Sequence, residues 1–168
     1  GLQTLRAHAR QVGDETDAVW WPCSREDGSV WNAWCHGTPG VAKAFATARR
    51  VGAAADNDAL FLLRAARGIA SANTGHFCLC HGVASRLDAF VDIHDALGDT
   101  MPPDVAAAAD ADAALLAALE PTALEAEAEP VQGSAEPARG LMTGAAGVYR
   151  TLLRYAGRLD GPYGHLLL

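Results

Sequence analysis

One plan recurs three times along this chain: a short turn that contains glycine, followed by an amphipathic run that itself ends at glycine. The three copies are CHGTPGVAKAFATARRVG at 35–52, CHGVASRLDAFVDIHDALG at 80–98 and MTGAAGVYRTLLRYAG at 142–157. Within each run the apolar residues recur at helical spacing, and a terminal glycine is typical of a helix end. The repetition predicts similar helical hairpins that stack around a common axis.

Two further helices are predicted between the copies. Residues 56–72 begin with residues that cap helices, and residues 102–119 begin with prolines and are rich in alanine. No segment alternates between apolar and polar residues as a strand does. The predicted fold is therefore all-α, in which the helices after Gly40, Gly82 and Gly147 are equivalent inner elements and the other two lie outside.

Composition limits the classes of function. The chain has 168 residues, of which 50% are hydrophobic and 20% charged, which predicts one soluble domain with a real core. The net charge of −7 argues against nucleic acid or an anionic membrane as a partner. There is no apolar run that could span a bilayer and no signal-peptide layout in the first residues, so we expect a cytoplasmic protein. The acidic, proline-containing stretch 120–139 is predicted to be a surface loop.

The Cys-His-Gly turns carry the candidate chemistry. If the hairpins stack around an axis, the turns before equivalent helices meet at one end, and the third copy, with Met142, lacks the ligands. Thiolate and imidazole are the usual zinc ligands, and a site with three protein ligands and one open position is catalytic rather than structural. Cys35, Cys80 and His81 make such a set, with Gly82 allowing a sharp turn. A disulfide framework is the weaker interpretation, because a Cys-X-Cys bridge is strained.

Each of these residues also has a plainer interpretation. Cys35 could be a buried small hydrophobic residue, and His81 a helix-start residue bonded to backbone. His76 could lie near the site or be an ordinary loop histidine. Trp31, Asn32 and Trp34 are expected to form a wall rather than to react. The two other cysteines are interpreted as a buried thiol beside the site, Cys78, and a loop thiol, Cys23.

The full motifs WCHGTPG, LCHG and GLMTGAAGVYRTLLRYAG, in that order, resemble the lanthionine synthetase C-like family. They are most similar to the cyclase end of class II lanthipeptide synthetases, and the terminal GPYGHLLL is similar to the end of those chains. The resemblance runs from about Trp31 to the C-terminus. It implies an α/α toroid with a zinc ion (Zn²⁺) at one end, and the family's zinc ligands map onto Cys35, Cys80 and His81.

The resemblance also implies a reaction. A cysteine thiol of a dehydrated, ribosomally made precursor peptide adds to dehydroalanine or dehydrobutyrine and closes a thioether ring. His36 is the expected proton-transfer residue; alternatively, its hydrogen bond stiffens the turn. Two other hypotheses stay open: a non-catalytic zinc-binding helical scaffold that holds a peptide or partner subunit, and a helical module with reduced, metal-free cysteines.

The chain departs from the family pattern in its upstream half. Family members are longer, and neither their Gly-His-Gly-type segment nor their acidic residue proposed for proton transfer has a match before Trp31. We therefore expect residues 1–168 to be a C-terminal portion of a cyclase domain. The upstream portion of the synthetase, or a partner chain, is expected to complete the core.

Overall fold

Each helix expected from the sequence is present. The computed structural model describes residues 1–12, 17–24, 26, 28–55, 57–72, 74–123 and 140–160, with side chains in the last range up to 157. The long helices are α2 (Thr38–Arg50), α3 (Asp58–Ser71), α4 (Val83–Leu97), α5 (Pro103–Ala117) and α7 (Ala145–Asp160). The predicted loop at 120–139, from residue 124 on, and the GPYGHLLL segment lie outside the described residues.

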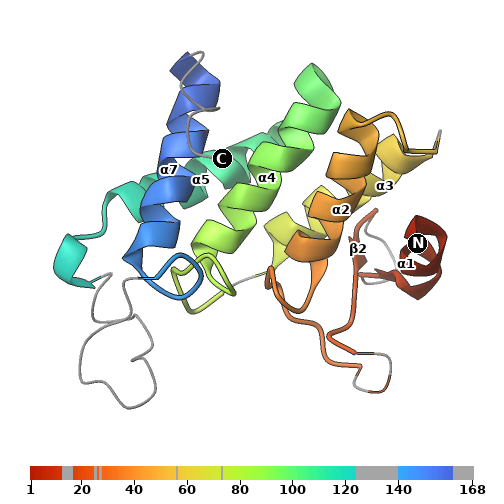
Figure 1. Cartoon of the computed structure of the whole chain (residues 1–168), viewed down its shortest axis with the longest axis horizontal. Helices are drawn as coiled ribbons and strands as arrows, with labels where there is room; N and C mark the ends of the chain where they lie inside the picture. The colour runs from red at the N-terminus through yellow and green to blue at the C-terminus, as the bar shows by residue number, and fades with distance from the viewer. Residues whose placement is uncertain are drawn as a thin grey trace.

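The helices form two layers (Figure 1). In one layer α4 lies between α2 and α7 and contacts both, and these are the helices that follow the three repeated turns. The other layer contains α3 and α5, which pack behind them. The three repeated helices thus share one layer and the other two pack behind them. Their inner and outer positions in a toroid stay a prediction, because the described part of the chain does not itself close a ring.

The core sits between the two layers and is centred on α4. Most residues of α4 are buried, including Leu87 and Phe90, which have no exposed surface. Phe45 from α2 and Leu62 from α3 pack into the same cluster. The helix ends follow ordinary rules: α5 begins with Pro103 in its first turn, and α4 ends at Leu97, directly before Gly98, whose φ of 60° is a left-handed conformation.

The all-α prediction is wrong at the beginning of the chain. After α1 (Leu2–His8), strand β1 (Arg10–Gln11) pairs antiparallel with β2 (Val19–Trp20). The hairpin packs against α3, where the Trp20 indole donates to the Gly68 carbonyl at 3.1 Å. Strands of two residues are too short to show alternation, so no sequence pattern indicated them.

The described helices include none that is both long enough and apolar enough to cross a membrane.

Candidate functional site

The two CHG turns share one close backbone contact. A Cβ atom on Gly37 would collide with the carbonyl oxygen of Trp31, six residues earlier. A Cβ atom on Gly82 would lie 2.6 Å from the carbonyl oxygen of His76, again six residues earlier. Only glycine allows the chain to approach itself this closely. The glycine of each Cys-His-Gly triplet is therefore required by the turn itself.

The third turn belongs to the same plan. A Cβ atom on Gly147, in the first turn of α7, would collide with the carbonyl oxygen of Leu141. Gly40, at the matching place in α2, has the same relation to Trp34. The sequence repeat is thus a repeat of backbone geometry, including the copy that lacks cysteine and histidine.

Hydrogen bonds join the three turns in a row. The N–H of Trp34 donates to the carbonyl of Cys80 at 2.8 Å, and the N–H of Cys35 reaches the same oxygen at 3.4 Å. The N–H of Cys80 in turn donates to the carbonyl of Met142 at 2.7 Å. Cys35, Cys80 and Met142 occupy the same place in the repeat. The prediction that the CHG turns meet at one end of the molecule is confirmed.

The side chains of this cluster are only partly buried. Cys35 is exposed, so its interpretation as a buried small hydrophobic residue is wrong. Cys80 is half-buried, and so is Cys78, which was predicted to be buried. The His81 ring packs edge-on against the His76 ring, with 4.8 Å between centroids. Thr74 donates its hydroxyl to the His81 carbonyl at 3.0 Å. His76 therefore contacts His81, one of the three predicted zinc ligands.

A pocket of about 450 Å³ opens beside His81. Trp31 and Asn32 form part of its wall, as predicted, whereas Trp34, predicted with them, does not line this pocket. The His36 ring packs edge-on against Trp31 with 6.5 Å between centroids. The Asn32 amide donates to the Ile69 carbonyl at 3.0 Å, which holds this wall against α3. The lining residues are Val30, Trp31, Asn32, Ala33, Thr74, Gly75, His76 and His81.

The donor types at this end suit zinc, since Cys35, Cys80 and His81 offer two thiols and an imidazole. The turns that carry the two cysteines are hydrogen-bonded together. Their side chains, however, are not gathered into a coordination set: among the residues that the structure describes, no three His, Cys, Asp or Glu side chains are grouped closely enough to hold a metal ion. The zinc set stays a prediction.

Comparison with known proteins decides the family. Residues 4–159 match the family described as lanthionine synthetase C-like protein. The chain belongs to this family. The match begins well before Trp31, where the motif resemblance was expected to begin. Neither the curated proteins nor the solved structures contain a match to this lanthionine synthetase C-like chain.

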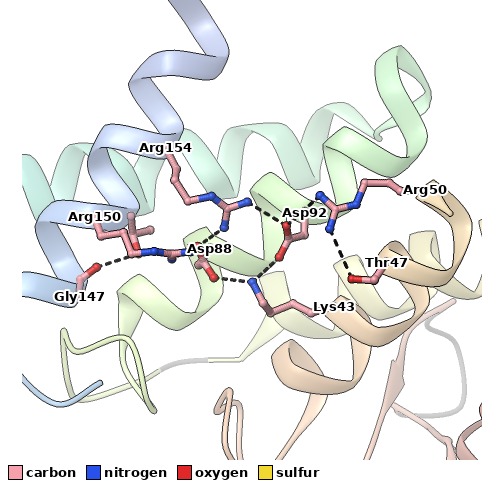
Figure 2. A network of polar contacts seen from close by, with 9 residues as sticks. Lys43, Thr47, Arg50, Asp88, Asp92, Gly147, Arg150 and Arg154 are labelled. Atoms are coloured by element: carbon pink, nitrogen blue, oxygen red, sulfur yellow. Dashed lines mark hydrogen bonds and ion pairs between the residues drawn. The ribbon is translucent and has the colours of Figure 1, made fainter. Parts of the chain in front are cut away.

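Sequence reasoning missed a partly buried network of charges in this lanthionine synthetase C-like protein. We call it the ion ladder (Figure 2). It connects α2, α4 and α7 and consists of Lys43, Arg50, Asp88, Asp92, Arg150 and Arg154. The sequence repeat itself could have indicated these residues. Lys43, Asp88 and Arg150 each lie six residues after the turn glycine of their copy, and Asp92 and Arg154 each lie ten residues after it.

The two carboxylates of the ion ladder are shared among neighbouring helices. Asp88 pairs with Lys43, with Arg154 and, at 3.0 Å, with Arg150. Asp92 pairs with Lys43 and, at 2.9 Å, with Arg154. Burial by itself raises the pKa of Asp88, but the charges of Lys43 and Arg154 outweigh burial and hold that pKa below its ordinary value. Asp88 is therefore a stable anion at neutral pH.

Proposed function

We propose that this protein is the zinc-dependent cyclase portion of a lanthipeptide synthetase. It adds the thiolate of a cysteine in a dehydrated precursor peptide to dehydroalanine or dehydrobutyrine, which forms a thioether ring. The observation that carries the proposal is the hydrogen-bonded pair of CHG turns, which brings Cys35 and Cys80 to one end of a lanthionine synthetase C-like chain.

Cys35, Cys80 and His81 would hold the metal in this proposal. Two thiolates and one imidazole leave one position of a tetrahedral zinc ion for a further ligand. Zinc bound there would lower the pKa of a substrate thiol, which is otherwise about 8.5, and so supply a thiolate at neutral pH.

The chain's own residues would bind the peptide and move the proton. In the addition, a sulfur–carbon bond forms at the β-carbon of the dehydro residue, and the electron pair of the double bond moves toward the adjacent carbonyl. The thiol proton is lost, and a proton must reach the α-carbon, so the net change adds S–H across the double bond. We assign the delivery of that proton to His36, whose ring packs on Trp31 at the wall of the pocket. Trp31 would hold the peptide against this wall.

The same proposal includes a complete α/α toroid. Each turn donates a hydrogen bond to the next copy in the same direction, as expected when one unit is repeated by rotation about an axis. On α7, Tyr149 and Leu153 are 44% and 56% exposed and lie one helical turn apart. Further polypeptide, either an upstream portion of the synthetase or a partner chain, would cover such a face and complete the ring.

A non-catalytic zinc-binding scaffold is the second candidate. It is favoured by the position of the His81 ring, which packs on His76 instead of converging with Cys35 and Cys80. A scaffold would bind zinc and a peptide without forming a thioether. Zinc analysis together with a cyclisation assay separates the two candidates.

The decisive experiment compares Cys80→Ala with Cys78→Ala, two residues apart in the same turn. The full chain, together with any partner polypeptide, is given a dehydrated precursor peptide, and residual thiols are counted by alkylation and mass spectrometry. We expect Cys80→Ala to lose both zinc and ring formation, because a site with two ligands binds metal weakly, whereas Cys78→Ala keeps both. Unchanged cyclisation in a zinc-free Cys80 variant would remove the metal from the mechanism.

A further inference from the structure

The ion ladder holds more positive than negative charge. Four cationic side chains share two carboxylates, in a chain whose overall net charge is −7. Across the described part of the chain, these four cations have no ion pair with any other acidic residue. Two positive charges are therefore left without a counter-charge inside the fold.

Hydrogen-bond donors are also in surplus. A guanidinium carries five N–H donors and an ammonium three, whereas a carboxylate accepts about four hydrogen bonds. The Asp88 and Asp92 carboxylates are almost fully covered, with 2% and 6% of their side-chain surface exposed. The cations around them are more open: Arg50 is 42% exposed and Arg150 is 23% exposed. Arg50 also donates to the Thr47 hydroxyl at 3.4 Å, and its remaining donors, like those of Arg150, are accessible to solvent.

The ion ladder lies on the side of α4 that faces away from α5. Arg86 pairs with Asp112 of α5 at 3.1 Å. Asp88 is two residues farther along α4 and therefore points to nearly the opposite side of the helix. Figure 2 shows the arginines of α7 and the basic side chains of α2 reaching Asp88 and Asp92 from the two flanks. The ion ladder consequently lies on one face, built by α2, α4 and α7.

We propose that this face binds a phosphate monoester. Planar N–H forks of arginine match the oxygens of such an anion in geometry as well as charge. A phosphate monoester carries about −1.5 to −2 charges at pH 7, which matches the two unbalanced positive charges, whereas a carboxylate would neutralise only one. The proposal does not depend on the cyclase reaction, because none of the ion-ladder residues belongs to the CHG turns.

Inorganic phosphate is the first probe. The full chain is titrated with it by isothermal calorimetry at pH 7, at an ionic strength held constant with chloride. We expect saturable binding that Arg150→Gln and Arg50→Gln each weaken about tenfold, the loss of one charge-assisted hydrogen bond. Both variants leave Asp88 paired with Lys43 and Arg154, so the fold is expected to persist, and thermal unfolding verifies this. Arg67→Gln, which alters a pair with the exposed Asp17, is the matched control and should bind phosphate like the parent.

A second arm identifies the source of the phosphate. A phosphoserine peptide that binds tighter than inorganic phosphate would indicate a peptide-borne group, while equal affinity would indicate a free phosphate. The same peptide with glutamate in place of phosphoserine should bind more weakly in either case. The proposal is overturned if phosphate shows no saturable binding at constant ionic strength. It is equally overturned if folded Arg150→Gln and Arg50→Gln variants bind phosphate as tightly as Arg67→Gln does.

Discussion

The CHG turns and the ion ladder connect the same neighbouring helices by opposite means. At the turns, backbone groups make the connections: the carbonyl of Cys80 receives N–H bonds from the first turn, and Cys35 keeps its side chain exposed. One and a half helical turns farther along, side chains make the connections, and Asp88 is almost entirely buried. The cysteine and histidine side chains thus take no part in the backbone bonds that join the turns, whereas the ion ladder joins the helices through side chains.

This difference predicts that changes in the two regions affect different properties. Substitutions of the histidine side chains at the turns should alter chemistry and leave the free energy of unfolding nearly unchanged. Substitutions in the ion ladder should lower that free energy.

The largest effect is expected at the turns, for His36→Asn. If His36 delivers the proton, cyclisation should slow by about 10²–10⁴-fold, which is typical of a general acid–base group, with zinc content and unfolding free energy unchanged. His94→Asn on α4 is the control and should cyclise at the parent rate. The measurement is the thiol-alkylation time course with atomic absorption for zinc. Loss of zinc in the His36 variant would make His36 a metal ligand or a support of the turn, and our assignment would be wrong.

The next effect concerns Asp88→Ala, which leaves Lys43, Arg150 and Arg154 without their shared carboxylate. Breaking a buried ion pair in this way costs about 3–5 kcal/mol of unfolding free energy. Asp17→Ala is the control, because Asp17 is exposed where it pairs with Arg64 and Arg67, and it should cost no more than about 1 kcal/mol. Urea denaturation of both variants at pH 7 measures the difference. Equal losses would show that the ion ladder is no more important than a surface pair.

The same comparison explains what sequence reasoning could reach. The helices were predictable because apolar residues such as Phe45 and Phe90 recur at helical spacing and glycines mark the ends. The meeting of the CHG turns followed from the repeat. Asp88 and Asp92 were missed because a charged residue next to buried apolar positions resembles a solvated one until its partners on two other helices are known. An alignment of the three copies with one another places Lys43, Asp88 and Arg150 at equivalent positions of neighbouring helices.

Side-chain placement at the turns was beyond sequence reasoning for a different reason. The direction of His81 depends on how sharply the chain bends at Gly82 and on the position of His76, which comes from the preceding loop. Residue types and spacing do not determine that bend. The exposed Cys35 illustrates the same point, because cysteine is more often buried.

A single ion pair on the other side of α4 sharpens the contrast with the ion ladder. Asp112 faces one cation, Arg86, at 3.1 Å, but the Asp112 Oδ2 and Arg86 Nε atoms are not aligned as a hydrogen bond, and neither has another hydrogen-bond partner in the described residues. Burial raises the pKa of Asp112 to about 6, and the charge of Arg86 offsets only part of this. One cation is thus too few to offset the effect of burial on the pKa of Asp112, whereas three cations lower the pKa of Asp88.

This raised pKa predicts the smallest effect, a pH dependence with a definite sign. The folded protein holds the Asp112 proton more tightly than the unfolded chain, whose ordinary pKa is 3.8. The unfolding free energy should therefore fall as pH rises from about 4 to about 6, by about 2–3 kcal/mol in total, and stay level above that.

Asp112→Asn removes the titrating group and with it this part of the pH dependence. Urea denaturation of parent and variant at pH 4, 5, 6 and 7 isolates it, because any cost of altering the Arg86 partner is the same at each pH in the variant. Asp88 does not obscure the result, since its lowered pKa places its titration, and the loss of its stabilisation, below this range. A difference between parent and variant that is constant from pH 4 to pH 7 would contradict the raised pKa and place Asp112 with the fully compensated acids of the ion ladder.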